Sequence, residues 1–144
     1  MSILGVIHSP FTGKGQTPIQ VTRSQAIGQV EVFPKYANDL RDIEHLFHIH
    51  LLYVFHKSSG CALHVKPFLD DHVHGIFVTR YPHRLNPVGL STVRLLSRQN
   101  NVLIIEGVDV LDGTPLLNIK PYVPDFDRRT ENVSAGWCET RSKK

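Results

Sequence analysis

The sequence predicts a mainly β protein, a small β-barrel with one helix and a non-Rossmann fold. Short runs rich in β-branched and aromatic residues recur with turn residues between them, as in barrels and sandwiches. A helical period occurs in one stretch, and no Gly-x-Gly-x-x-Gly follows an early strand. At 144 residues, with 41% hydrophobic and 20% charged residues, the chain is long enough for one globular domain with its own core.

Seven expected strands follow one another along the chain. In order they are ILGVI (3–7), QVEVF (29–33), LFHIHLLYVF (46–55), GIFVT (75–79), LSTVRLL (90–96), NVLIIEGV (101–108) and PLLNIK (115–120). The third run is apolar on both faces, which is typical of a central, buried strand. Residues 125–144 are polar and of mixed charge, so we expect irregular structure there, with Trp137 as an anchor.

The expected helix lies between the second and third strands, in PKYANDLRDIEHLF (34–47). Tyr36, Leu40, Ile43 and Phe47 recur there at the i, i+4, i+7 and i+11 positions. This spacing places four apolar side chains on one face of a helix. The proline that opens the stretch suits the first turn of a helix.

The charge distribution points to an anionic partner. The formal net charge is +3 and the isoelectric point is about 9.0. No Asp or Glu occurs between residues 72 and 105, whereas the same window carries four arginines, Arg80, Arg84, Arg94 and Arg98. Such a bias fits a surface that faces phosphates. It fits equally well a set of ordinary, solvated surface arginines.

The remaining composition indicates a cytoplasmic protein without a membrane association. No run approaches the ~20 apolar residues of a membrane span, and the N-terminus lacks the basic and apolar regions of a signal peptide. Cys61 and Cys138 lie far apart without a metal-binding spacing. We expect both to be reduced thiols.

Nine histidines are many for this length, and several are paired. His48 and His50 form His-x-His, His56 has the same strand parity, and His72 and His74 form a second pair. Paired imidazoles can hold zinc or iron. They can also donate and accept hydrogen bonds in a partly polar core or line a ligand pocket. Without a carboxylate at ligand spacing we predict no metal site, although the pattern alone leaves both interpretations open.

Two segments carry the densest functional signal. In VTRYPHRLNPVGLS (78–91), Arg80 and Arg84 flank a loop and could bind a carboxylate or phosphate, and Gly89 permits a close backbone approach. In GVDVLDGTPLLNIKPYVP (107–124), Asp109 and Asp112 flank a turn and could surround a small polar ligand. Alternatively, Asp112 caps the turn through local backbone bonds. Spacing does not separate these two roles.

Four stretches, GVIHSPF, FVTRYPHRLNPVGLS, GVDVLDGTPLLNIKPYVP and a terminal GW, occur in this order. Together they resemble the TrmO family, also called TsaA-like or YaeB-like, of S-adenosylmethionine-dependent tRNA N6-methyltransferases. The resemblance implies a β-barrel methyltransferase domain over residues 1–137, a polar tail over 138–144, and a homodimer. The implied reaction is tRNA methylation at position 37: a methyl group passes to N6 of N6-threonylcarbamoyladenosine, next to the anticodon.

The resemblance also implies a set of site residues. Those expected to bind S-adenosylmethionine are Ile19, Gln20, Val21, His56, Lys57, Arg80, Leu90, Asp109, Val110, Leu111 and Asp112. For the carboxylate of the threonyl group we expect Arg84 as the partner, because a guanidinium matches a carboxylate through two parallel hydrogen bonds. Two other functions stay open: a non-catalytic module that binds S-adenosylmethionine or RNA, and a metal-dependent barrel enzyme that uses the paired histidines.

Overall fold

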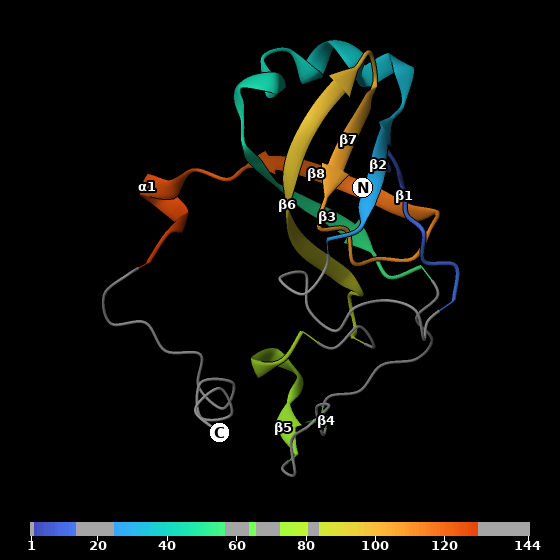
Figure 1. Cartoon of the computed structure of the whole chain (residues 1–144). Coiled ribbons are helices and arrows are strands. Elements are labelled where there is room, and N and C mark those ends of the chain that lie inside the picture. Colours follow the sequence, from blue (N-terminus) through green and yellow to red (C-terminus); the bar gives the residue numbers. More distant parts are fainter. Residues whose placement is uncertain (1, 14–24, 57–63, 66–72, 81–83, 130–144) are drawn as a thin grey trace.

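The computed structural model describes residues 2–13, 25–56, 64–65, 73–80 and 84–129, and it shows a closed β-barrel (Figure 1). Its six strands are β1 (Gly5–His8), β2 (Ile27–Val32), β3 (His48–Val54), β6 (Val88–Gln99), β7 (Val102–Glu106) and β8 (Thr114–Pro121). Their order around the barrel is β1-β2-β7-β6-β3-β8, every neighbouring pair is antiparallel, and β8 closes on β1. Closure leaves no free sheet edge. The predicted fold class is confirmed.

Alternation along the strands builds the core inside the barrel. On β3, Ile49, Leu51 and Tyr53 are buried, whereas His48 and His50 lie on the outer, half-buried face. We expected both faces of this strand to be apolar and buried, and that expectation is wrong for the outer face. The inward set is completed mainly by aliphatic side chains that are at most 1% exposed, among them Ile7, Val30, Val93, Leu103, Ile105 and Leu116.

The expected helix between β2 and β3 is present as two 3-10 helices, η3 (Pro34–Leu40) and η4 (Ile43–His45). Asp42 separates them in a left-handed conformation, with φ of 70°. A non-glycine residue in that region interrupts the repeat that an α-helix requires. The predicted apolar face survives in part: Leu40 and Ile43 are buried, whereas Phe47 lies beyond η4 and is 61% exposed.

Three further segments differ from the sequence-based expectation. Most of the expected strand GIFVT forms a 3-10 helix, η5 (Ile76–Val78), because Phe77 has no core to enter and is 86% exposed. Before η5, a small antiparallel sheet pairs β4 (His64–Val65) with β5 (His74–Gly75). The polar region after β8 begins with a short helix, α1 (Pro124–Asp127), where we expected irregular structure. The expected anchor Trp137 lies outside the described residues.

The two ends of the barrel carry different structures. Figure 1 shows the 3-10 helices η3 and η4, in cyan to teal, at one end, and β4, β5 and η5 beyond the opposite end. At this second end the segments that follow β1 and β7 pack together and lie next to the start of β6. No helix of the described residues is long and apolar enough to cross a membrane.

Candidate functional site

Two sequence motifs that are about a hundred residues apart meet at the second end of the barrel. Ser9 donates its hydroxyl to the carbonyl of Val110 at 2.6 Å and its amide to Asp112 Oδ1 at 3.1 Å. The amide of Asp112 in turn donates to the carbonyl of Phe11 at 2.8 Å. These bonds fix the segment after β1 onto the segment after β7. GVIHSPF and GVDVLDGTP therefore form one structural unit.

Asp112 anchors this unit. Its Oδ1 also lies 3.4 Å from Nδ1 of His8. The turn itself is capped by Thr114, whose hydroxyl donates to the carbonyl of Leu111 at 2.6 Å, and Gly113 supplies the positive φ of 86° that the turn needs. Asp112 thus holds a distant loop, a role that neither sequence-based alternative had foreseen.

Asp109 belongs to a different network. Ser91 Oγ donates to Asp109 Oδ1 at 2.7 Å, and the hydroxyl of Tyr53 lies 2.6 Å from Ser91 Oγ. Ser91 and Tyr53 are almost fully buried, at 2% and 3% exposure. A serine hydroxyl has a single proton. Because Ser91 donates that proton to Asp109, the proton between Tyr53 and Ser91 comes from Tyr53.

The raised pKa of Tyr53 favours this direction, whereas the burial of Asp109 works against it. Burial raises the pKa of Asp109, while the hydrogen bond from Ser91 and the nearby positive charge of Arg80 oppose that rise. Burial and the carboxylate of Asp109 raise the pKa of Tyr53 well above its usual range. Tyr53 is therefore a neutral donor at any physiological pH, and the chain Tyr53–Ser91–Asp109 ends on a half-buried acceptor.

Gly89 makes room for the ring of Tyr53. A Cβ atom at Gly89 would overlap the Tyr53 ring and the edge of Phe55. The two rings meet edge to face, with centroids 5.5 Å apart. The predicted close approach at Gly89 is confirmed, and the group that approaches is a side chain of the protein itself.

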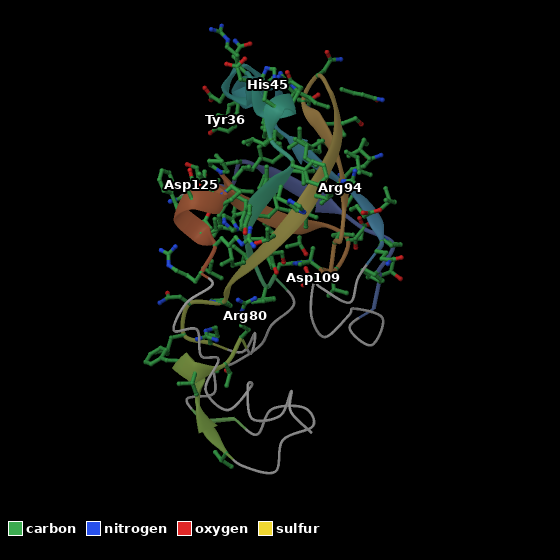
Figure 2. The ribbon with its side chains drawn as sticks, turned by 60° about the vertical axis from the view of Figure 1, so that its left-hand side comes forward. Tyr36, His45, Arg80, Arg94, Asp109 and Asp125 are labelled. Carbon is green, nitrogen blue, oxygen red and sulfur yellow. The ribbon has the colours of Figure 1, made fainter. Side chains whose placement is uncertain are left out.

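Arg80 completes the site from the loop that follows η5. It is exposed, and Figure 2 shows Arg80 and Asp109 at the end of the barrel away from Tyr36 and His45. Arg84 supports this loop, because its guanidinium donates to the carbonyl of Thr79 at 2.8 Å and to that of Ile76 at 3.1 Å. One predicted arginine, Arg80, therefore acts electrostatically on the half-buried carboxylate of Asp109, and the other, Arg84, holds the η5 turn.

The other predicted site residues are distributed unevenly. Leu90 is 49% exposed on the outer face of β6, because strand alternation turns it away from Ser91. Val110 is in the core, Leu111 is half-buried, and His56 is exposed just after β3. Ile19, Gln20, Val21 and Lys57 lie outside the described residues.

The paired histidines on β3 lie outside the barrel, away from Asp109. His50 Nδ1 lies 2.8 Å from Thr92 Oγ1, its Nε2 lies 3.4 Å from Asp127 Oδ2, and its ring meets Tyr122 edge to face. Hydrogen bonding is therefore the observed role of His50, whereas His48 makes ring contacts with Phe47 and Tyr122. In the part of the chain that the structure describes, no group of three His, Cys, Asp or Glu side chains could hold a metal ion. His72 lies outside the described residues.

Two arginines of the acid-free window have partners within the protein. Arg94 lies over the ring of Phe47, 4.6 Å from its centroid, and its Nη1 is 3.9 Å from Glu106 Oε1. Arg98 binds Glu44 and the carbonyls of η3. Of the arginines in this window, Arg80 is therefore a better candidate for a contact with phosphate than Arg94 or Arg98.

A protein-family model identifies the family to which this fold belongs. The model of the tRNA-methyltransferase O N-terminal domain matches residues 6–128. The chain belongs to this family. Among similar proteins, a probable S-adenosyl-L-methionine-binding protein of Pyrococcus abyssi is 52% identical over 137 residues, which are 94% of this chain and 74% of that protein. The human tRNA (adenine(37)-N6)-methyltransferase is 33% identical over 132 residues, 86% of this chain and 30% of that protein.

Solved TrmO structures share the fold. The crystal structure of TrmO from Pseudomonas aeruginosa matches with a TM-score of 0.78 and 36% identity, and the match covers 94% of this chain and 60% of that chain. Another TrmO crystal structure matches with a TM-score of 0.77 and 34% identity, over 93% of this chain and 62% of that chain. This chain therefore spans about three fifths of the length of these solved relatives.

Proposed function

We propose that this protein is an S-adenosylmethionine-dependent tRNA methyltransferase whose acceptor is N6 of N6-threonylcarbamoyladenosine at position 37. The observation that carries the proposal is the half-buried carboxylate of Asp109, held by Ser91 beside Arg80, in a chain of the TrmO family. Relatives named tRNA (adenine(37)-N6)-methyltransferase or S-adenosyl-L-methionine-binding protein support the activity and the cofactor. The reaction would take place in the cytoplasm, where tRNA is modified.

The residues at this end of the barrel fit the cofactor chemically. S-adenosylmethionine carries a sulfonium, an ammonium and ribose hydroxyls, which favour a carboxylate partner, and its own carboxylate favours a guanidinium. Asp109 and Arg80 supply this pair of opposite charges, and Asp109 is half-buried. When bound, the cofactor supplies an electrophilic methyl group. Asp109 would hold its polar groups and Arg80 its carboxylate.

The test of this assignment is titration calorimetry with S-adenosylmethionine. Arg80→Ala removes a charge-assisted hydrogen bond, which should cost roughly 1.5–3 kcal/mol, or about 10- to 150-fold in affinity. Arg94→Ala is the matched control, because it removes an exposed arginine whose partners, Phe47 and Glu106, lie outside the site. Equal affinities of the Arg80→Ala variant and the parent would remove Arg80 from the site.

The acceptor needs a partner for its threonyl carboxylate, and Arg84 is our candidate. A guanidinium matches a carboxylate through two parallel hydrogen bonds, and the bonds from Arg84 to the carbonyls of Thr79 and Ile76 fix its place at the η5 turn. An Arg84→Ala variant would lose loop support together with charge. Cofactor affinity therefore has to be measured together with methyl transfer. Loss of methyl transfer with retained cofactor affinity would indicate that Arg84 binds the acceptor.

The tRNA would meet the surface formed by η5 and Arg80. Phe77 is the most exposed large apolar residue of the described chain, at 86%, and no acidic residue lies between positions 72 and 105. An exposed aromatic ring beside a cationic side chain is the arrangement that binds unpaired bases by stacking and their phosphates by charge. The unpaired nucleotides of an anticodon loop have this chemistry.

We propose that a second copy of the chain covers the outer face of β3 and β6, giving the expected homodimer. Exposed apolar side chains gather there, with Val88 at 42%, Leu90 at 49% and Leu96 at 40% exposure. Leu90 pairs across the strands with Leu52, so the apolar surface continues onto β3. Leu90→Asp should convert a dimer into a monomer in sedimentation, and an unchanged mass would place the interface elsewhere.

A non-catalytic S-adenosylmethionine-binding module is the second candidate, because several relatives carry only the name of a binding protein. The two candidates differ in turnover. Transfer of a labelled methyl group to tRNA separates them, whereas cofactor affinity alone does not. A metal-dependent enzyme has less support, since His50 already contacts Thr92 and Asp127; elemental analysis of untagged protein tests it.

A further inference from the structure

A serine inside the barrel is unusual among the surrounding residues. Ser91 and Thr114 are the buried polar residues of the described chain; the other buried side chains there are hydrophobic, and among them Tyr53 alone carries a hydroxyl. Thr114 is explained by its bond to the carbonyl of Leu111. Ser91 points into the core from β6, in an inward series with Val93, and contacts Tyr53 and Asp109. A buried hydroxyl costs free energy unless both of its roles, donor and acceptor, are used.

The hydrogen bonds of this network run in one direction, because the hydroxyl of Ser91 has a single proton to donate. Tyr53 donates to Ser91, and Ser91 donates to Asp109. Donation to a carboxyl oxygen stabilises the ionised form of that group and fixes the orientation of its plane. Chains of hydrogen bonds also strengthen one another in a low-dielectric interior. The core of the barrel thereby acts on a side chain at its rim.

We propose that Tyr53 and Ser91 are positioning residues, which hold Asp109 ionised and oriented as an acceptor for the cofactor. The proposal rests on the proposed function for the identity of the ligand. The role of the two residues toward Asp109 rests on the hydrogen bonds alone. Neither Tyr53 nor Ser91 needs to touch the cofactor.

Competing influences on Asp109 make this assistance necessary. Burial favours the neutral carboxyl group, which is a poorer acceptor and carries no charge to offset a cation. Among the described residues, the charged and titratable groups that act on Asp109 are Arg80, from the loop after η5, and Tyr53, from β3. Arg80 is exposed and therefore screened by solvent. Two hydrogen bonds favour ionisation directly, one from Ser91 and one from the backbone of Asp109 itself, and Ser91 is the side chain among these donors.

The experiment compares three variants. Ser91→Ala removes the donor to Asp109. Tyr53→Phe keeps the ring that packs against Gly89 and Phe55 and removes the hydroxyl alone. Thr92→Val is the matched control, because it removes a hydroxyl from the adjacent position of the same strand, where that hydroxyl contacts His50 on the outer face.

The first measurement is the carbon-13 NMR titration of the Asp109 carboxyl in the cofactor-free protein, with the signal assigned from Asp109→Asn. Loss of Ser91 leaves burial less opposed, so the pKa of Asp109 should rise in Ser91→Ala, and by less in Tyr53→Phe. It should not change in Thr92→Val. If Ser91→Ala does not fold, Tyr53→Phe decides. A folded variant whose Asp109 titrates as in the parent overturns the proposal.

The second measurement is the pH dependence of the dissociation constant for S-adenosylmethionine. The affinity for S-adenosylmethionine should fall as pH drops through the pKa of Asp109. At a pH below that pKa, each unit by which a variant raises the pKa should weaken binding by up to about tenfold. A variant in which the pKa of Asp109 shifts but the pH dependence of S-adenosylmethionine binding stays that of the parent overturns the part of the proposal that concerns the cofactor. A parent that does not bind S-adenosylmethionine at all refutes the proposed function, while the NMR titration still decides the role of Tyr53 and Ser91 toward Asp109.

Discussion

Arg98 Nη1 lies 2.7 Å from Glu44 Oε1, an ion pair that joins β6 to η4 at the first end of the barrel. The same side chain donates to the carbonyls of Leu40 at 3.0 Å and Ala37 at 3.3 Å, which belong to η3. The hydrogen bond to Arg98 lowers the pKa of Glu44. Arg98 thus closes one end of the fold, far from the site at Asp109.

Arg98→Ala is therefore expected to affect stability. Two helix carbonyls lose a charged donor, which should lower the free energy of unfolding by about 1–3 kcal/mol in a urea titration. The dependence of tRNA affinity on salt should stay that of the parent. Arg80→Ala is the counterpart: it should reduce the slope of log K against log salt by about one. A stable Arg98→Ala variant with a reduced slope would assign Arg98 to the tRNA surface instead.

Gly89→Ala should destabilise the barrel. A Cβ atom there overlaps the ring of Tyr53, and overpacking of this kind costs typically about 1–3 kcal/mol. Gly75→Ala provides the control, since a Cβ at Gly75 meets nothing within 4 Å. Thermal unfolding of both variants measures the difference. Equal melting temperatures would mean that Tyr53 and Phe55 relax without cost.

Asp109→Asn should raise stability at neutral pH while it weakens cofactor binding. Burial raises the pKa of Asp109, so its ionised form is less favourable in the folded than in the unfolded chain. The parent consequently loses stability as pH rises from the unfolded pKa through the folded pKa. The gain in melting temperature of the variant should be present above that interval and absent below it. A gain that is independent of pH would attribute the effect to something other than ionisation.

Phe77→Ala should weaken tRNA binding. Loss of one stacked base costs roughly 1–3 kcal/mol. Phe126→Ala, on α1, is the matched control: it also removes a largely exposed phenylalanine, at 70% against 86%. Filter binding with the same tRNA compares the two. An equal loss in both variants would indicate a general effect of apolar surface, and no loss for Phe77→Ala would exclude η5 from the tRNA site.

The fold was predictable to a large extent because the strands alternate. Inward residues such as Val93 and Leu103 follow the period of two that a barrel imposes. The interruption of the helix at Asp42 was not predictable, because the apolar period shows which face of a helix is buried and carries no information on a single left-handed residue. The η5 turn was also missed, since GIFVT has the composition of a strand but no partner to cover Phe77.

The candidate site was predictable only in part. Asp109 and Arg80 stand out in the sequence by their local context, because each is a charged residue just after a predicted strand. Tyr53 and Ser91 were missed, since their contact joins residues 38 positions apart and depends on the register of β3 and β6. A signal was present: Gly89, Ser91 and Val93 share one strand face, and a serine on a buried face requires partners. The anchoring role of Asp112 depends on Ser9, at the other end of the sequence.

The most direct test is transfer of a labelled methyl group from S-adenosylmethionine to two preparations of the same tRNA, with and without the threonylcarbamoyl group on adenosine 37. Calorimetry on the same protein first establishes that the cofactor binds. We predict incorporation into the modified tRNA alone, and in Arg84→Ala a loss of incorporation that is larger than the loss of cofactor affinity. Equal incorporation into both preparations, or none into either despite bound cofactor, would contradict it.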